Sequence, residues 1–266
     1  MDVARVAAVI LVISLDKRIS CWPYSIEDSP EEDSFPLTVD HMGKNLSQVP
    51  LGNFSITEAN LAYNQIQTLS PYVFYMNLYK NLHNLQLSHN NMSSIDVGAF
   101  RELPELRELD LSSNKISNLD SNTFIRNHQL TKLDLALNNI TFDIEIPFLR
   151  SFFIQTLILS ENNIIHVYDI TFARMPHLTS LLLDHNQLYY LSPNCFVHLK
   201  YLQYINLANT GVYSLSSSMF RTVPRLVDLT STTLSKKFEP PLKKVKTHQL
   251  VKLMAIEKFM EEDYEM

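Results

Sequence analysis

The chain is poor in the residues and segments that several protein classes require. Its 266 residues include only four glycines and two cysteines, which fits turns built by other residues and excludes a disulfide-rich framework. The net charge of −6 is mild and argues against a dedicated nucleic-acid binder. No hydrophobic run reaches the about 20 residues that cross a membrane, so we expect no transmembrane segment.

One motif, Leu-x-x-Leu-x-Leu-x-x-Asn-x-Leu, instead recurs along most of the chain. Its Asn returns at a constant spacing after a slightly longer first step, and a seventh copy has Thr210 in its place. A Phe keeps the same period. Two series in phase identify a solenoid of leucine-rich repeats. The Asn positions are Asn64, Asn90, Asn114, Asn138, Asn162 and Asn186, and the Phe positions are Phe74, Phe100, Phe124, Phe148, Phe172, Phe196 and Phe220.

The third copy shows what each repeat is expected to do. Leu109 and Leu111 alternate around Asp110, which predicts a short strand with both leucines buried. The Asn that follows is expected to bond backbone groups that the turn leaves unpaired, and Phe124 to stack on the Phe above and below. The predicted fold class is an α/β-type leucine-rich-repeat solenoid. This would be a curved horseshoe with a parallel sheet on its concave face and a mostly irregular or short helical convex side.

Three departures from the period carry their own predictions. The longer first step is expected to place its two extra residues in the return segment rather than in a strand. Seven copies are complete, and an eighth begins at Leu226 and Leu229 but fails at Ser231. The fourth copy has Asp143 and Ser151 at usually apolar positions, which predicts a local bulge on the convex side.

The N-terminus is typical of an exported protein. Arg5 precedes an apolar run over residues 6–15, which predicts a signal peptide, with a short apolar start of a cytosolic protein as the alternative. A bridge between Cys21 and Cys195 would cross about five strand spacings, roughly 24 Å, so we expect Cys195 to be a buried free thiol. Four glycosylation sequons support export, and they begin at Asn45, Asn53, Asn91 and Asn139.

These patterns divide the chain into five regions. They are a signal peptide (1–15), an acidic linker (16–36), an N-terminal cap (37–55), the repeats (56–235) and a basic, then helical tail (236–266). In the tail, Lys243, Lys244 and Lys246 form a pattern that resembles sulfated-glycan binding sites, although the acidic residues that follow favour a solvated tail. The apolar end of the tail is interpreted as a helix over the open end of the solenoid.

The repeat motif and the cap-like segment before it resemble those of a known family. The 24-residue repeat and its Phe series resemble the animal extracellular leucine-rich-repeat proteins with typical repeats, a group that includes chaoptin, connectin, Toll, Slit and the acid-labile subunit. Residues 39–50 are similar to the N-terminal cap of that family, except that His41 stands where the cap has a Cys. The resemblance covers roughly residues 37–234 and implies an extracellular binding protein without choosing among members.

The residues that flank the buried leucines are expected to face the concave surface. Four apolar residues meet there on adjacent strands, as in a protein-binding hot spot. Scattered exposed apolar residues are also ordinary on soluble proteins, and the tail is an alternative cover. Asp110 and Asp134 are lateral neighbours, which we interpret as solvated carboxylates that meet a basic partner. The candidate ligand-binding residues are Leu137, Ile158, Leu182, Tyr204, Asp110, Asp134, Glu161, Asp184 and His185.

The sequence predicts binding rather than catalysis. It has no nucleophile motif and no phosphate loop, and no pair among His83, His89 and His185 has metal-ligand spacing. We therefore predict no catalytic residue, no metal site and no cofactor. The expected protein is secreted, glycosylated and non-enzymatic, and it binds a protein ligand on the concave sheet. The alternatives are a structural scaffold subunit and an intracellular regulatory leucine-rich-repeat protein.

Overall fold

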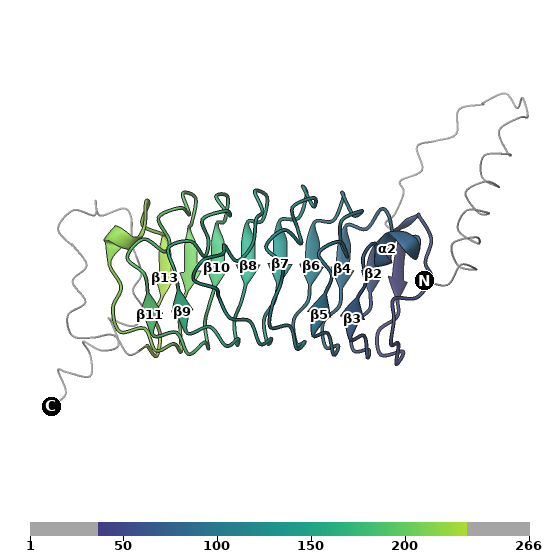
Figure 1. Ribbon diagram of the computed structural model, residues 1–266, viewed down its shortest axis with the longest axis horizontal. Helices are drawn as coiled ribbons and strands as arrows, with labels where there is room; N and C mark the ends of the chain where they lie inside the picture. The colour runs from purple at the N-terminus through teal and green to yellow at the C-terminus, as the bar shows by residue number, and fades with distance from the viewer. Residues whose placement is uncertain (1–36, 233–266) are drawn as a thin grey trace, which may run out of the picture. The chain divides into compact units, whose positions relative to one another are not determined.

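The computed structural model describes residues 37–232, and nine short strands in that range form one sheet (Figure 1). Each strand comes from one coil of the chain, and from β2 to β13 neighbours pair in parallel. This stack confirms the predicted solenoid. In order, the strands are β1 (Leu37–Asp40), β2 (Ile56–Asn60), β4 (Asn84–Gln86), β6 (Glu108–Asp110), β7 (Lys132–Asp134), β8 (Thr156–Ile158), β10 (Ser180–Leu182), β12 (Tyr204–Asn206) and β13 (Leu226–Asp228).

Several predictions from the sequence fall outside the described residues. They are the signal peptide (1–15), the acidic linker (16–36), the tail (236–266) with its cluster of Lys243, Lys244 and Lys246, and the position of Cys21.

The remaining elements lie in the return segments between strands. β3 (Thr68–Leu69) pairs with β5 (Ser94–Ile95), and β9 (His166–Val167) pairs with β11 (Tyr190–Leu191). One turn of helix, α2 (Val73–Met76), and one 3₁₀ turn, η1 (Ser217–Met219), complete the set. The mostly irregular return side is therefore as predicted.

The strand register follows the sequence period. Glu108, Leu109 and Asp110 pair with Lys132, Leu133 and Asp134, the equivalent residues of the next repeat. The first step pairs Glu58 with Asn84, so its two extra residues lie outside the strands, as predicted.

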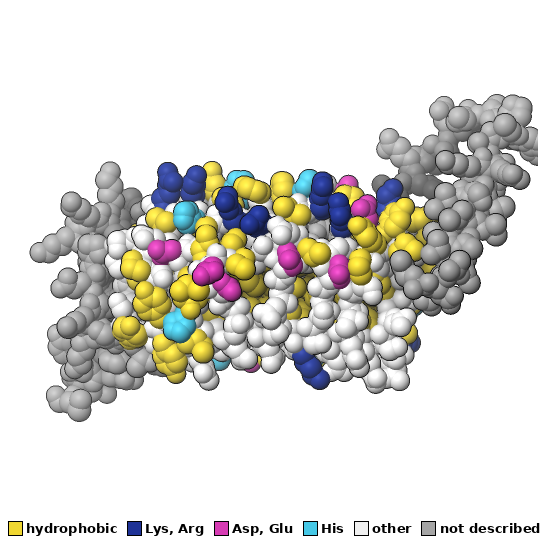
Figure 2. Space-filling model, viewed as in Figure 1, with side chains coloured by type: hydrophobic (Ala, Val, Ile, Leu, Met, Phe, Trp, Pro, Cys, Tyr) yellow, Lys and Arg dark blue, Asp and Glu magenta, His cyan; other side chains and the backbone are white. Residues whose placement is uncertain are grey.

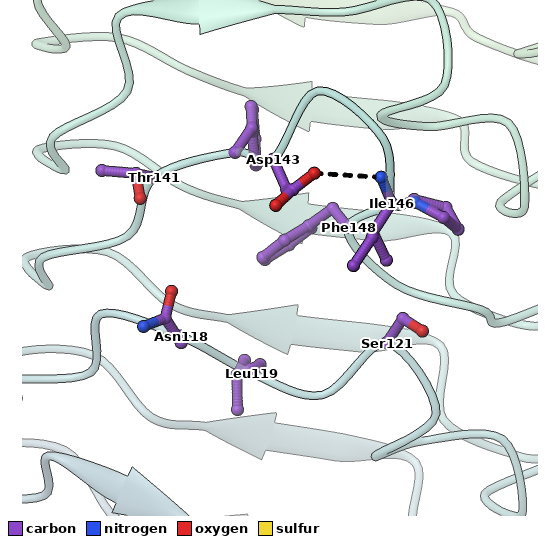
Figure 3. A pocket seen from close by; sticks show the side chains of 9 residues that line it. Asn118, Leu119, Ser121, Thr141, Asp143, Ile146 and Phe148 are labelled. Atoms are coloured by element: carbon purple, nitrogen blue, oxygen red, sulfur yellow. Dashed lines mark hydrogen bonds between the residues drawn. The ribbon is translucent and has the colours of Figure 1, made fainter.

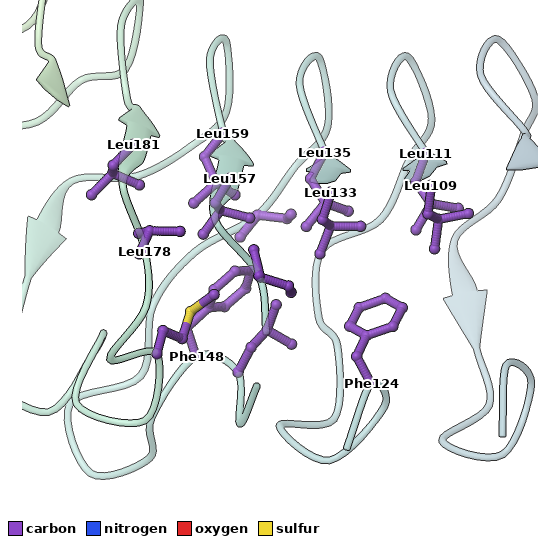
Figure 4. Packing of buried hydrophobic residues seen from close by; sticks show 14 of the residues in the cluster. Leu109, Leu111, Phe124, Leu133, Leu135, Phe148, Leu157, Leu159, Leu178 and Leu181 are labelled. Atoms are coloured by element: carbon purple, nitrogen blue, oxygen red, sulfur yellow. The ribbon is translucent and has the colours of Figure 1, made fainter. Parts of the chain in front are cut away.

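In the core, leucines from successive coils stack in rows along the solenoid (Figure 4). The central strand residues Leu109, Leu133 and Leu157 are at most 1% exposed. A second row that includes Leu111 and Leu135 stacks beside them and is fully buried. Because every leucine packs against the coils on both sides, one coil alone could not bury its apolar face, and stability grows with the number of neighbours.

The buried Asn of each coil bonds as the sequence predicted. The amide nitrogen of Asn114 donates to the carbonyls of Leu111 (3.0 Å), Ser112 (3.0 Å) and, in the preceding coil, Leu87 (3.1 Å). Its oxygen accepts the N–H of Met92, 3.0 Å away. One side chain thus closes its own turn and joins two coils. Thr210 makes one such bond, from its hydroxyl to the carbonyl of Leu207 at 2.6 Å.

The Phe series stacks only in part. Ring centroids are 5.6 Å apart for Phe74–Phe100 and 5.4 Å apart for Phe100–Phe124. Phe148, however, packs at 5.0 Å against Phe142, which meets the edge of Phe172 at 5.5 Å. The expectation that Phe124 stacks on a Phe at both sides is therefore wrong on the Phe148 side. Phe142 is an extra ring that the series did not reveal.

The fourth coil bulges as predicted. The carboxylate of Asp143 accepts the N–H groups of Glu145 (2.6 Å) and Ile146 (3.2 Å), which fixes a turn outside the usual path. The turn leaves Ile144 and Ile146 exposed by 64% and 52%.

The eighth coil extends further than the sequence suggested. Leu226 pairs with Tyr204 in register, so it is an exposed-face residue, while Val227 and Leu229 are the buried ones. The hydroxyl of Thr232 donates to the carbonyl of Leu229 at 2.8 Å, as Thr210 does one coil earlier. The prediction that this copy starts at Leu226 and fails at Ser231 is wrong, because the repeat frame lies two residues earlier.

Candidate functional site

The outward residues of the nine-stranded sheet form an open surface, here called the sheet face. The first and third residues of each three-residue strand point to this face, and the middle residue is buried. Ile158 pairs with Asp134 on one side and with Leu182 on the other. The register therefore brings four of the predicted binding residues into one row on adjacent strands, in the order Asp110, Asp134, Ile158 and Leu182.

The last residue of most strands has a structural role as well. In six strands it is Asn or Asp, and its side-chain oxygen accepts the N–H two residues further on at 2.8–3.1 Å. This bond satisfies a backbone donor where the chain leaves the sheet. The residues are Asp40, Asn60, Asp110, Asp134, Asn206 and Asp228.

Ile158 and Leu182 occupy this position in two neighbouring coils and cannot make the bond. Both side chains are partly exposed on the sheet face. Leu137, 46% exposed, lies at the turn after β7, and Tyr204 is the first residue of β12. The structure thus places Ile158 and Leu182 side by side, with Leu137 and Tyr204 at opposite ends of the flanking strands.

The recurring Asn of the repeat, replaced by Thr in the last two coils, is here called the ladder Asn. The residue before this position has a left-handed backbone conformation, a feature that the sequence period did not reveal. Its φ lies between 52° and 57° in all eight coils, and none of these residues is glycine. The set is Tyr63, His89, Ser113, Leu137, Glu161, His185, Asn209 and Ser231. This conformation costs a non-glycine residue roughly 1–2 kcal/mol. The repeated turn therefore holds Leu137, Glu161 and His185 outward on one line.

The polar rim is partly fixed by hydrogen bonds. One carboxylate oxygen of Asp184 accepts the hydroxyl of Ser160 at 2.6 Å, and the other lies 3.0 Å from Nδ1 of His185. The side chain of Asp184 is only 15% exposed, so these bonds hold it in place beside Leu182. Glu161 is exposed.

Burial raises the pKa of two groups on the sheet face. The pKa of Asp134 is raised, first by burial and then by Asp110, while the N–H of Ala136 and the charge of Lys132 lower it. Burial also raises the pKa of Tyr204, with the carboxylates of Asp228 and Asp184 adding to the effect. Lys132 forms an ion pair with Glu108 at 3.3 Å.

The described residues offer little for chemistry. Between residues 37 and 232, no group of three or more His, Cys, Asp and Glu is arranged to hold a metal ion. Cys195 is a buried free thiol, as predicted, and burial raises its pKa. The same range contains no helix long and apolar enough to cross a membrane. A pocket of about 250 Å³ beside the fourth-coil bulge has one carboxylate, from Asp143, among its lining groups (Figure 3).

The four predicted glycosylation sites are all exposed. Asn45 and Asn53 lie in the region before β2, and Asn91 and Asn139 directly follow a ladder Asn. Backbone bonds from Asn91 to Ile66 and from Asn139 to Ile116 place the latter two at equivalent positions of their coils. The side chains therefore stand open to modification.

Comparisons with known proteins agree with this geometry. The family model described as "Leucine rich repeat" matches residues 80–140 and 154–212. No curated protein matches the sequence. Among solved structures, the Drosophila Toll–Spätzle complex has a TM-score of 0.56 at 17% identity, over 81% of this chain and 32% of the other. An internalin (inlF) from Listeria monocytogenes has a TM-score of 0.44 at 22% identity, over 59% of this chain and 43% of the other.

The chain spans less than half the length of either structure. At 17% identity, the likeness to the Toll structure concerns the fold alone. Leucine-rich repeats generally mediate contacts between proteins, because their stacked strands present a long surface. The family model matches the coils in residues 80–140 and 154–212, and the parallel strands on both sides of these ranges continue the same solenoid.

Proposed function

We propose that the protein is a secreted, glycosylated and non-enzymatic recognition protein that binds a protein ligand on the sheet face. One observation carries the proposal: two neighbouring strands end on Ile158 and Leu182, where six others end on an Asn or Asp that accepts the N–H two residues further on. A partly exposed apolar pair at a position that favours Asn or Asp loses a local hydrogen bond. Contact with a ligand would offset that loss by removing both side chains from water.

The surroundings of the pair suit a hot spot. Aromatic and aliphatic anchors in protein interfaces are typically rimmed by polar groups that exclude water. Here the bonded Asp184 and its neighbour His185 lie on one side, and Asp134 lies on the other. A stable interface buries about 800 Å² on each partner. The ligand would therefore extend along the sheet face to Asp110, Glu161, Leu137 and Tyr204, and its charge opposite the acids would be positive.

The Toll structure is of a leucine-rich-repeat protein in complex with Spätzle. At 17% identity the likeness supports the fold of this chain and does not choose its ligand. Export is supported by the apolar N-terminal run and by the exposure of Asn45, Asn53, Asn91 and Asn139.

The sharpest test replaces Ile158 and Leu182 by Asn together. Because Asn206 closes its turn with a 3.0 Å bond to Ala208, Asn at the two positions is expected to close theirs. The double variant should therefore melt at or above the wild-type temperature and lose its ligand. The full-length wild type and the double variant would each be immobilised and exposed to conditioned medium of the source tissue. The sets of proteins that the two retain would then be compared.

A matched control is Gln86→Asn, which introduces the same residue in the same column on β4 without removing an apolar side chain. It should retain the wild-type set of captured proteins. The alanine set at Leu137, Ile158, Leu182 and Tyr204 should lose them. If all variants capture the same proteins, the sheet face is not the binding site and the scaffold alternative is favoured.

Export is tested separately by expression in secretory cells. The protein should appear in the medium and shrink on enzymatic deglycosylation, and Asn91→Gln/Asn139→Gln should remove part of the shift. Protein found only in the cytosol, without glycans, would contradict secretion and favour the intracellular regulator.

A further inference from the structure

A second surface is formed by the segments that connect the recurring Phe of each coil to the next strand of the sheet. In five consecutive coils these segments are 124–130, 148–154, 172–178, 196–202 and 220–225, and none contains Asp or Glu. They carry six Lys or Arg and three His, in a chain that has 28 acidic residues. We call this surface the basic edge. Its charged and titratable residues are Arg126, Arg150, Arg174, Lys200, Arg221, Arg225, His128, His177 and His198.

Three of the arginines form a column. Arg126, Arg150 and Arg174 occupy the same position in successive repeats, and the strands that follow them pair in the register of the repeat. All three are exposed, and His198 continues the column into the next coil. Equivalent positions of neighbouring coils lie about 5 Å apart, the spacing of adjacent strands. Like charges therefore lie close together on this edge.

Within residues 37–232, no ion pair neutralises the column. The ion pairs among residues 37–232 are Lys132–Glu108 and His185–Asp184, and neither involves the basic edge. Figure 2 shows most of the visible Lys and Arg side chains along one long edge, the edge on which α2 lies in Figure 1, with His and hydrophobic side chains between them. Asp and Glu lie mainly across the middle of that view. The charges of the two signs are thus separated in space.

Aromatic rings run beside the arginines. His128 lies 5.3 Å from Phe153, and His177 lies 5.5 Å from Tyr201, with the ring planes tilted by 36° and 31°. Nδ1 of His177 also bonds the carbonyl of Phe152. A base inserted between two rings needs about twice the 3.4 Å base spacing, more than these pairs leave. Neither pair therefore leaves room for a base between its two rings.

We propose that the basic edge binds a linear sulfated polysaccharide that runs across the coils. A guanidinium binds oxyanions through two parallel N–H donors, so each arginine of the column suits one sulfate. A repeating charge at one-coil spacing fits a polymer with regularly placed anions. The site differs from the tail cluster of Lys243, Lys244 and Lys246 and from the sheet face. Its biological use rests on the export proposed above, whereas its binding does not.

The experiment is retention of the full chain on immobilised heparin in a salt gradient. The test variant is Arg126→Gln/Arg150→Gln/Arg174→Gln, which keeps most of each side chain. The matched control, Lys44→Gln/Lys115→Gln/Lys132→Gln, removes the same charge from three exposed lysines outside the basic edge. A tail variant, Lys243→Gln/Lys244→Gln/Lys246→Gln, separates the two basic regions. Melting temperatures establish that each variant is folded.

The wild type should elute above physiological salt, because each ion pair with the polymer releases counterions. The arginine variant should elute much earlier, and the control and tail variants close to the wild type. Wild-type elution below physiological salt overturns the proposal. So does an equal shift for the arginine and control variants, or a loss confined to the tail variant.

A single-stranded RNA of the same charge, offered as a competitor, should displace the protein from heparin less well than free heparin does. Equal or better displacement would mean a nucleic-acid site and would also overturn the proposal. If the triple variant does not fold, Arg126→Gln and Arg174→Gln are measured singly, and each should show a smaller shift of the same sign. No shift in either would contradict the arginine column.

Discussion

The two halves of the solenoid follow the repeat with different strictness. Over residues 56–140 the ladder Asn is unbroken and the rings of Phe74, Phe100 and Phe124 stack in line. Over residues 141–232 the stack is diverted by Phe142, and the last two ladder positions are threonines. The first half shows what the fold requires. The second half shows where the sequence departs from that requirement.

Both proposed surfaces depend on the second half. Ile158 and Leu182 put apolar side chains into the column of strand-end residues there, and most of the basic edge lies in the same coils. Natural sequences depart from local rules mainly at functional or strained positions. The comparison therefore favours residues 141–232 as the part that carries recognition, with residues 56–140 as its support.

The largest effect is expected from breaking the regular half. Asn114→Leu should destabilise by about 2–4 kcal/mol, because three carbonyls and one N–H lose a buried partner at once. Asn138→Leu should cost a similar amount, since it makes the same set of bonds. Thr210→Leu should cost less, as one bond is lost. Urea unfolding followed by circular dichroism measures all three, and equal costs would refute the role given to the amide.

The reverse change should make the second half more regular. Thr210→Asn places an amide where Asn186, one coil earlier, donates to the carbonyls of Leu159, Leu183 and Asp184. The new side chain would reach the equivalent carbonyls and should raise stability by about 1 kcal/mol. Thr210→Ser is the control, because it retains a hydroxyl and gains no donor. A stability of Thr210→Asn no greater than that of the control would show that the last coils cannot accept the ladder geometry.

The sequence predicted the regular features because each follows from one period. The alternation around Asp110 fixed the register, and the buried amide of Asn114 followed from its place after the strand. The diversion at Phe142 was not predictable in this way. It depends on how far one ring reaches between coils, which is a packing outcome rather than a period. The left-handed residues were also missed, because their side chains share no chemistry and only their place before the Asn recurs.

For the candidate surfaces, the sequence predicted which residues share the sheet face. It did not predict the hydrogen bonds that the last residue of each strand makes. The pairing of Ile158 with Leu182 follows from the period. The bond from Asp134 to the N–H of Ala136 does not, because it depends on the turn that follows the strand. The basic edge was missed as well, since its arginines lie at a variable position that the leucine pattern does not mark.

The smallest effect concerns Asp134, the acid at the boundary between the two halves. Asp134→Asn keeps the oxygen that accepts the N–H of Ala136 at 2.9 Å and removes the charge beside Asp110. Burial and Asp110 raise the pKa of Asp134, so the folded state holds the proton more tightly than the unfolded one and stability falls as pH rises through that raised pKa. The variant should thus gain about 0.5 kcal/mol at pH 7, after allowance for solvent screening, and nothing at pH values below the ordinary pKa of Asp, where the wild-type carboxyl is also neutral. The control Asp228→Asn makes the same atomic change beside Asn206 rather than beside an acid. Urea unfolding at several pH values compares them, and a gain for Asp134→Asn that persists at acidic pH would show that the charge is not its cause.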